Sequence, residues 1–577
     1  MSSALADTSN YARITVSDLL DLIRESVIGR NDVVDGPFGP RRVTYADYTA
    51  SGRSLTFVED YIRDQVLPLY ANTHTESSGT GLQTTRFRED ARTIIRRCVK
   101  ATDEHAVLFC GNGSTGAIDL IARVLGIRIP ESLDDRYGLS NLIPPNERPV
   151  VFIGPFEHHS NELPWRESIA DVVVIPEDSD GHVNLEDLEA ELIASADRPL
   201  KIGSFSAASN VTGITTDTAT VASLLHRHGA LSFWDVAAAA PYIGISMTPT
   251  NDDPLSYKDA IFVSPHKMIG GPGTPGLLVA RKDLFTNRVP AVPGGGTVAF
   301  VNRDQHRYLD DIEHREEGGT PSIIGSIRAG LAFALKESVG TQTIRAREQS
   351  FIRRAIESWS ANPNIEILGN PEADRLSIVS FVIRHGDHRL HHNFVVALLN
   401  DLFGIQSRGG CSCAGPYGHR LLGIDIVTSR EYEREIARGC EGIKPGWVRV
   451  NFNYFISEQV FDFILDAVHL VADQGWRIVP EYQFDPMTGL WTHADGRGDA
   501  PLSLHDIAFS RDGIEHPDHR RTEGEDALRG YLDEGKQILL AARPGKDEPK
   551  RPDITEDFER LRWFHFPDEI RRELLGK

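Results

Sequence analysis

The chain has 577 residues, of which 40% are hydrophobic and 25% charged, so it is long enough to bury a large core in several subdomains. Its formal net charge of -22 argues against binding nucleic acid or an anionic membrane through a basic surface. Five cysteines cannot form a disulfide framework, so we expect a cytoplasmic protein that acts on a small molecule.

No export signal or membrane anchor is predicted. Residues 1–10 lack the basic and then apolar order of a signal peptide. No stretch approaches the roughly 20 apolar residues of a transmembrane helix.

Apolar runs alternate with helical patterns between residues 60 and 325. Residues 150–154, 172–176 and 260–264 form short, strongly β-branched runs, and residues 185–194 and 218–228 have helical spacing. This alternation predicts an α/β domain with helices around a mostly parallel sheet.

Three further regions flank this large domain. Residues 326–475 predict a small α+β domain, with strands at 377–383 and 447–455, and residues 1–59 are expected to contribute to it. Residues 476–577 are charged and rich in Gly and Pro, so we expect a peripheral or partly disordered tail.

A glycine turn, Gly111-Asn112-Gly113-Ser114-Thr115-Gly116, runs directly into an amphipathic helix pattern. Free backbone N–H groups and the positive end of the helix dipole favour a phosphate there, and the hydroxyls of Ser114 and Thr115 add donors. An ordinary capped helix start would look similar, so the turn alone leaves both interpretations open.

The segment Glu157-His158-His159-Ser160-Asn161 follows a predicted strand. The His158 imidazole could stack on a cofactor and move protons, because its unperturbed pKa lies near neutrality. The histidine pair could equally be a loop feature or half of a metal site. No second His/Cys cluster has ligand spacing, so we predict no metal.

Two predicted strands end in ionisable residues. Asp235 follows the strand 231–234, where it could hold a proton on a pyridine nitrogen or simply cap a helix. Ser264-Pro265-His266-Lys267 follows the strand 260–264 and precedes the glycine loop 270–273. A desolvated lysine there could stay neutral and form an imine with an aldehyde, although alone it could be a surface lysine.

In this order of phosphate turn, histidine, aspartate and lysine, the sequence closely resembles the class V aminotransferases, especially the cysteine desulfurases, over about residues 40–475. The resemblance implies the pyridoxal-phosphate-dependent transferase fold type I, with a seven-stranded, mostly parallel sheet. It implies that the cofactor, pyridoxal 5'-phosphate, is attached to Lys267 and that His158 and Asp235 contact it. It further implies that Ser264 and His266 bind its phosphate and that Asn210 lies near its phenolic oxygen.

Further segments bear on assembly and on the reaction. Gly319-Thr320-Pro321 is similar to a segment that contacts phosphate across a subunit interface, which implies a homodimer and places Thr320 among the cofactor ligands. The loop 408–414 resembles the R-x-G-x-x-C-A loop of desulfurases, which puts Cys413 at the nucleophile position. Arg449 resembles an arginine that binds a substrate carboxylate, with Arg408 as a second candidate.

The resemblance predicts that L-cysteine is converted to L-alanine while Cys413 becomes a persulfide, which a sulfur-acceptor protein could receive. Ala238 stands where desulfurases often have glutamine, and the pair Cys411 and Cys413 is closer to molybdenum cofactor sulfurases. The two thiols could instead be buried or metal-bound. Two other functions stay open: an aminotransferase or amino-acid C–S or C–Se lyase in which Cys413 is not essential, and a non-catalytic binding protein on a decayed fold.

Overall fold

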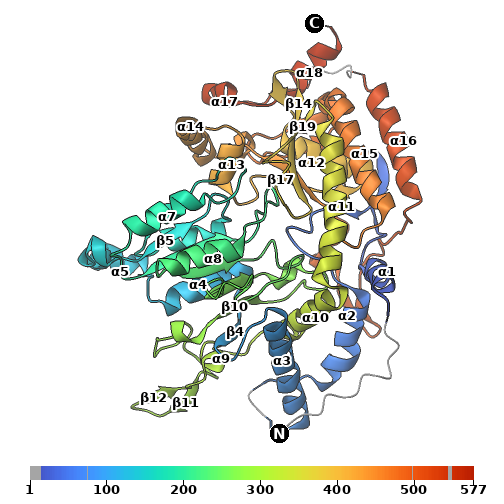
Figure 1. Ribbon diagram of the computed structural model, residues 1–577. Coiled ribbons are helices and arrows are strands. Elements are labelled where there is room, and N and C mark those ends of the chain that lie inside the picture. Colours follow the sequence, from blue (N-terminus) through green and yellow to red (C-terminus); the bar gives the residue numbers. More distant parts are fainter. Residues whose placement is uncertain (1–13, 74–75, 497, 499, 544–548, 577) are drawn as a thin grey trace.

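The computed structural model describes residues 14–576 except 74–75, 497, 499 and 544–548, so part of the expected N-terminal segment lies outside the described residues. Figure 1 shows the large domain in the lower part of the molecule and the small domain above it. Within the described residues, no helix is long and apolar enough to cross a bilayer.

The large domain is built around a seven-stranded sheet with the order β4-β10-β9-β8-β7-β5-β6. β10 runs in the opposite direction to the other six strands, which are parallel to one another. The predicted mostly parallel sheet is therefore confirmed. The strands are β4 (His105–Cys110), β5 (Val150–Ile153), β6 (Asp171–Val174), β7 (Lys201–Ser206), β8 (Leu231–Asp235), β9 (Ala260–Val263) and β10 (Gly276–Arg281).

Both faces of this sheet are covered, so residues along its central strands β7, β8 and β9 are buried almost without interruption. Successive residues of β4 alternate between two cores, with Val107 in one and Leu108 in the other. Helix α4 (Gly113–Val124) packs on one face. The other face is covered by α3 (Gly79–Cys98), α7 (Leu185–Ala194), α8 (Thr218–Arg227) and α10 (Ile323–Val339).

The small domain has an antiparallel sheet with the order β13-β14-β18-β17. Its strands are β13 (Ile365–Ile367), β14 (Ile378–His385), β17 (Arg408–Gly410) and β18 (Trp447–Asn451), and the adjoining helices are α11 (Thr341–Ser360), α12 (His392–Phe403) and α15 (Glu458–Gln474). Strand β3 (Thr44–Tyr45) pairs with β16 (Ile405–Gln406). The N-terminal segment therefore lies against this domain.

The last hundred residues differ from the expectation of a peripheral tail. After α15 the chain forms η10 (Gly475–Glu481), β19 (Tyr482–Phe484), β20 (Trp491–His493), α16 (Ala527–Ala541), α17 (Glu556–Leu561) and α18 (Pro567–Leu574). Single aromatic and aliphatic side chains, spaced between charged residues, pack into the core, including Leu539, Phe558, Phe564, Phe566 and Ile570. Residues 500–524 are exposed.

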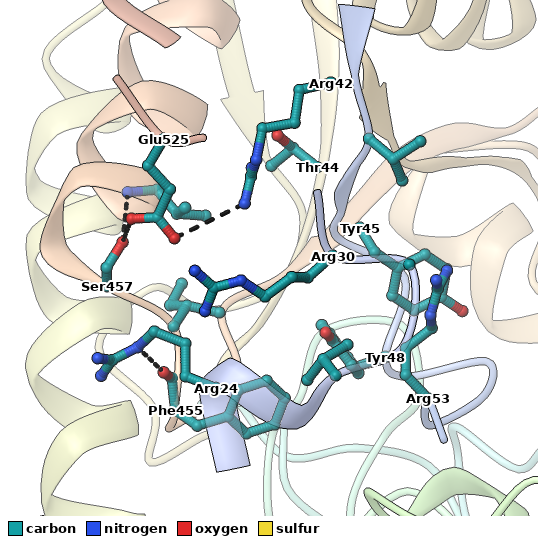
Figure 2. A pocket seen from close by; sticks show the side chains of 15 residues that line it. Arg24, Arg30, Arg42, Thr44, Tyr45, Tyr48, Arg53, Phe455, Ser457 and Glu525 are labelled. Atoms are coloured by element: carbon teal, nitrogen blue, oxygen red, sulfur yellow. Dashed lines mark hydrogen bonds and ion pairs between the residues drawn. The ribbon is translucent and has the colours of Figure 1, made fainter. Parts of the chain in front are cut away.

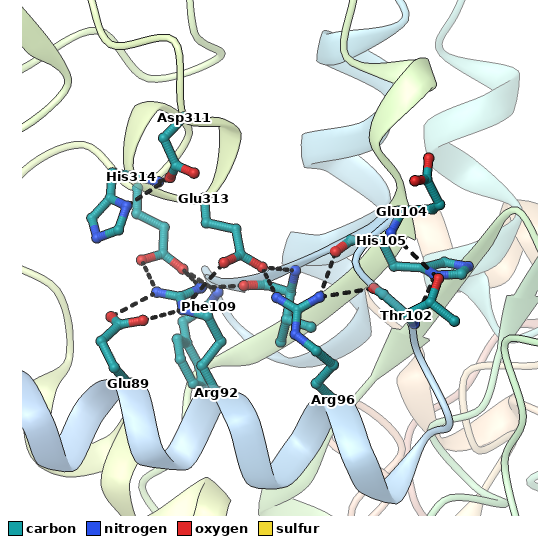
Figure 3. A network of polar contacts seen from close by, with 12 residues as sticks. Glu89, Arg92, Arg96, Thr102, Glu104, His105, Phe109, Asp311, Glu313 and His314 are labelled. Atoms are coloured by element: carbon teal, nitrogen blue, oxygen red, sulfur yellow. Dashed lines mark hydrogen bonds and ion pairs between the residues drawn. The ribbon is translucent and has the colours of Figure 1, made fainter. Parts of the chain in front are cut away.

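A polar network covers the free edge of β4 (Figure 3). The amide groups of Val107 and Phe109 donate to the carboxylates of Glu313 and Glu317, each at 2.7 Å. Arg92 on α3 donates to the Val107 carbonyl and contacts Glu317 at 3.0 Å. The network therefore fixes α9 (Ile312–Arg315) and the residues after it to the edge of the sheet.

Candidate active site

A cavity of about 220 Å³ lies where strands β8 and β9 end and the small domain meets the large one. All but one of the predicted site residues line it. These are Ser114, Thr115, His158, Asn210, Asp235, Ser264, His266, Lys267, Arg408, Cys413 and Arg449. The exception is Thr320, which is exposed and lies outside the cavity of its own chain. Its predicted contact across a subunit interface stays a prediction.

Lys267 ends the short turn η7 (Pro265–Lys267) that follows β9. Burial lowers the pKa of its amine to about 8, with Asp235 and Asp47 opposing that shift and Arg449 and Arg408 adding to it. A substantial fraction of this amine is therefore neutral near pH 8, as nucleophilic attack on an aldehyde requires.

The glycine turn brings the start of α4 against the strand that carries the lysine. Gly113 has a φ of +56°, and a Cβ there would lie 2.7 Å from Ser264 Oγ. The Ser114 amide donates to that same hydroxyl at 2.9 Å. The N-cap side chain of Asn112 makes no capping hydrogen bond, so the helix start keeps donors for an anion. Thr115 adds a hydroxyl, which bonds Ser160 Oγ at 2.6 Å.

The loop that carries His158 is held from both sides by buried polar residues. Glu157 accepts from Ser206 Oγ and from Asn161 Nδ2, each at 2.6 Å, and burial raises its pKa to about 7. Asn161 also donates to the Ser204 carbonyl at 3.1 Å. These contacts tie the loop to β7 and fix the histidine at the cavity wall.

The His158 ring is neutral at physiological pH. Its Nδ1 accepts the Ser160 amide proton at 3.1 Å, which places the ring proton on Nε2. Burial and, secondarily, the Lys267 charge lower its pKa to about 3. This favours a ring that stacks and donates and that takes up no proton near neutral pH.

Asp235 lies at the end of β8 and is buried, with 5% of its surface exposed. The Ala237 amide donates to it at 2.9 Å. Burial raises the pKa of this carboxyl, and that hydrogen bond together with the Lys267 charge opposes the rise. A cationic partner in the cavity would therefore be needed to stabilise the carboxylate.

Two arginines from adjacent small-domain strands form the positive end of the cavity. Arg408 on β17 stands opposite Arg449 on β18. Arg449 is buried and donates to Asp47 Oδ1 at 2.8 Å and to the Asn210 carbonyl at 2.9 Å. Asp47 balances only part of this charge, so a carboxylate would be bound here.

Sequence reasoning missed Asp47 because it lies 402 residues from Arg449 and in no recognisable motif. The neighbouring cavity residues Thr49 and Ala50 were missed for the same reason.

The loop 408–414, which contains Cys411 and Cys413, is hydrogen-bonded to large-domain residues at the cavity. Ser412 and Cys413 both have positive φ, 51° and 56°, which side-chain-bearing residues seldom adopt. The loop is held in place because His159 N donates to the Cys413 carbonyl and Asn210 Nδ2 to the Ser412 carbonyl, each at 2.8 Å. Cys413 itself is exposed, whereas Cys411 is half-buried.

Pyridoxal phosphate fits these residues. The cavity offers a helix start free of side chain at Gly113, a lysine of lowered pKa and a buried aspartate. Asn210 Oδ1 and Arg449 Nε are buried without a hydrogen-bond partner among the described residues, so a polar ligand would satisfy them. Within those residues, no group of three or more His, Cys, Asp or Glu side chains could hold a metal ion.

The profile of the family described as Aminotransferase class-V matches residues 44–430. The chain belongs to this family. Its members depend on pyridoxal phosphate, so this protein is a pyridoxal-phosphate-dependent enzyme. The chain is 29% identical over 388 residues to a probable cysteine desulfurase of Staphylococcus aureus, which covers 67% of this chain and 86% of that protein. A probable cysteine desulfurase of Halalkalibacterium halodurans is 28% identical, covering 67% and 87%.

Solved structures of this family share the fold. The apo structure of a cysteine desulfurase from Thermococcus onnurineus has a TM-score of 0.62 and 22% identity, covering 80% of this chain and all of that one. The cysteine desulfurase CsdA of Escherichia coli, in an S-sulfonic acid form, has a TM-score of 0.59 and 20% identity, covering 80% and 99%. The predicted fold class is thereby confirmed.

Proposed function

We propose that the enzyme is a cysteine desulfurase, which converts L-cysteine to L-alanine and leaves the sulfur as a persulfide on Cys413. The observation that carries this proposal is the exposed Cys413 on the wall of the cavity that also contains Lys267 and Arg449. A thiol in that position reaches a substrate whose carboxylate is bound by the arginines.

When bound, pyridoxal phosphate supplies an aldehyde for the substrate amine and a ring that accepts electron density from Cα. Ser114, Thr115, Ser264 and His266 would hold its phosphate. Asp235 would stabilise its pyridine nitrogen, and Asn210 would contact its phenolic oxygen. The neutral His158 ring would stack on the cofactor.

The chain's own groups carry the rest of the reaction. Arg449, with Arg408, binds the α-carboxylate and orients the substrate. Lys267 removes the Cα proton once its amine is released, and its pKa of about 8 suits that transfer. The Cys413 thiolate attacks the substrate sulfur, so an S–S bond forms and the Cβ–S bond breaks. The electron pair of the broken bond stays on Cβ, which takes up a proton, and Lys267 returns a proton to Cα, so that the product leaves as alanine.

Cys413→Ala tests this assignment, with Cys411→Ala as a matched control two residues away. The Cys413 variant should lose at least about 100-fold in alanine and persulfide formation from L-cysteine, because the nucleophile is gone. It should keep the visible absorbance of the bound cofactor. The Cys411 variant should keep its activity.

Other outcomes would favour the alternative functions. Undiminished turnover by Cys413→Ala would favour an aminotransferase or a C–S or C–Se lyase. Assays with L-cysteine, L-selenocysteine and ordinary amino acids, scored for sulfide, alanine and keto acids, would distinguish the aminotransferase from the lyase.

We also propose a cytoplasmic homodimer that passes its sulfur to an acceptor protein. In support of the dimer, Thr320 is exposed and follows a segment that Glu313 and Glu317 fix to the sheet edge. Sedimentation analysis should give twice the chain mass, and Thr320→Ala should weaken cofactor binding without dissociating the dimer.

A further inference from the structure

Asp47 pairs with both arginines of the candidate active site. Its Oδ1 accepts from Arg449 Nη2 at 2.8 Å, and its Oδ2 lies 3.9 Å from Arg408 Nη1. Both arginines line the cavity, whereas Asp47 does not. Arg449 Nε is buried and has no hydrogen-bond partner among the described residues. The Asp47 carboxylate therefore takes up part of the arginine charge and leaves donors for a ligand.

The position of Asp47 is fixed by backbone hydrogen bonds within the small domain. The Ala46 amide donates to the Gln406 carbonyl at 3.0 Å, and the Asn451 amide donates to the Ala46 carbonyl at 2.9 Å. Gln406 and Asn451 each lie two residues along the chain from one of the two arginines. The contacts that anchor this segment therefore also align the Asp47 side chain with the arginine pair.

The side chain of Tyr45 adds a further anchor, because its hydroxyl donates to the Asp47 carbonyl at 3.1 Å. Figure 2 shows Arg53 and Tyr48 near this ring. The Arg53 guanidinium lies 5.1 Å from the centre of the ring, and the Tyr48 ring packs edge-on at 4.8 Å. All three side chains line a small pocket that shares no residue with the active-site cavity. Asp47 is thus supported from outside that cavity.

The described residues at this end of the cavity leave one positive charge unbalanced, because two guanidinium groups face the single carboxylate of Asp47. The two lining histidines do not add to this charge near pH 7, since burial lowers the pKa of His158 to about 3 and that of His266 to about 4. Lys267 and Asp235 also line the cavity, and the proposed function assigns both to the cofactor.

We propose that Asp47 restricts the enzyme to α-amino acids that carry a single carboxylate. One unbalanced positive charge suits one α-carboxylate. A second negative charge, on the substrate side chain, would have no cationic partner and would be repelled by Asp47. This inference rests on the proposed binding of the substrate carboxylate by Arg449 and Arg408, but it does not depend on sulfur transfer by Cys413.

The test uses the enzyme loaded with pyridoxal phosphate and compares L-asparagine with L-aspartate, which have nearly the same shape and differ by one negative charge. The absorbance of the cofactor reports the binding of each amino acid, so no turnover is needed. The unmodified enzyme should bind asparagine at least about tenfold more tightly than aspartate. Equal affinities would overturn the proposal.

Variants of Asp47 test the role of its charge. Asp47→Asn keeps the shape and removes the charge, so it should raise the affinity for aspartate relative to asparagine at least about tenfold. Asp47→Glu keeps the charge and should stay close to the unmodified ratio. Asp171→Asn is the matched control, because Asp171 pairs with Arg198 at 2.6 Å on the edge strand β6, and it should leave the ratio unchanged.

A purely structural role of Asp47 predicts a different result. Asp47→Asn would then weaken the binding of both amino acids to the same extent, and the unchanged ratio would overturn the proposal. Aspartate that fails to bind to Asp47→Asn would overturn it as well.

Two arginine variants separate this inference from the function on which it rests. Arg449→Gln should weaken asparagine binding at least about tenfold, and an unchanged affinity would refute the proposed carboxylate binding itself. Arg408 is 46% exposed, so Arg408→Gln carries the test if Asp47→Asn does not fold. It should shift the ratio further against aspartate. If Arg449→Gln behaves as expected but neither of the other two variants changes the ratio, the inference about Asp47 alone is wrong.

Discussion

At the scale of single residues, the environment of Lys267 sets the pH at which the apoenzyme can take up its cofactor. Only the neutral amine attacks the aldehyde, and burial lowers its pKa to about 8. We expect the rate of cofactor uptake to rise with pH and to level off above about pH 8. Stopped-flow absorbance on the apoenzyme measures this profile.

A charge variant supplies the control for that profile. Arg408 lowers the Lys267 pKa, so Arg408→Gln should move the midpoint to higher pH. A midpoint near the ordinary lysine pKa in the unmodified enzyme would show that the amine is not desolvated.

The sequence anticipated those site residues that lie in local motifs at strand ends, such as His158, Asp235 and Lys267. Their positions follow because parallel strands bring their carboxyl ends to one edge of the sheet. Asp47 could not be foreseen in this way, since its partner Arg449 comes from a strand 402 residues later. Nor could the strained φ of Cys413, which depends on contacts from His159 and Asn210.

At the scale of secondary-structure elements, the junction between α4 and β9 depends on one glycine. Gly113→Ala would place a methyl group 2.7 Å from Ser264 Oγ, so the helix start must move. We expect at least about tenfold weaker cofactor binding, measured by equilibrium absorbance.

Gly126→Ala is the matched control because it has a similar φ of +67° and open space around it. It should cost about 1 kcal/mol of stability and leave cofactor affinity intact. Equal losses of affinity in both variants would mean that backbone strain, rather than crowding at the phosphate turn, is responsible.

The attachment of α9 to the sheet depends on Glu317, which is buried against Arg88 and Arg92. Glu317→Ala removes the buried carboxylate shared by these two buried guanidinium groups, so we expect a loss of about 3–5 kcal/mol in the free energy of unfolding. Glu89→Ala, on the exposed side of the same arginines, should cost less than about 1 kcal/mol. Denaturant titration of both variants makes the comparison.

At the scale of the whole molecule, the C-terminal hundred residues are part of the small domain rather than an appendage. Phe564 is fully buried, so Phe564→Ala should cost about 3–5 kcal/mol. Phe509, 80% exposed on the hairpin of β21 (Ala508–Ser510) and β22 (Gly513–Glu515), is the control, and Phe509→Ala should change stability by less than about 0.5 kcal/mol. If thermal unfolding showed unchanged stability for both variants, Phe564 would not be part of the core of the small domain.

Composition explains why that part of the fold was not foreseen. The segment has few apolar runs and many charged, Gly and Pro residues, which is the usual signature of disorder. Its burial instead comes from isolated residues such as Phe558 and Phe566, which pack because a hydrophobic surface of the small domain already exists. Tertiary packing of this kind leaves no periodic pattern for a sequence to display.

The polar network on the edge strand β4 also protects the protein against aggregation. An outer strand with free amide and carbonyl groups is a template on which another chain can add a strand, and such pairing leads to aggregation. Here the outward amides of Val107 and Phe109 are occupied by carboxylates, and the Val107 carbonyl by a guanidinium. The same contacts that hold α9 in place therefore prevent another chain from adding a strand at this edge of the sheet.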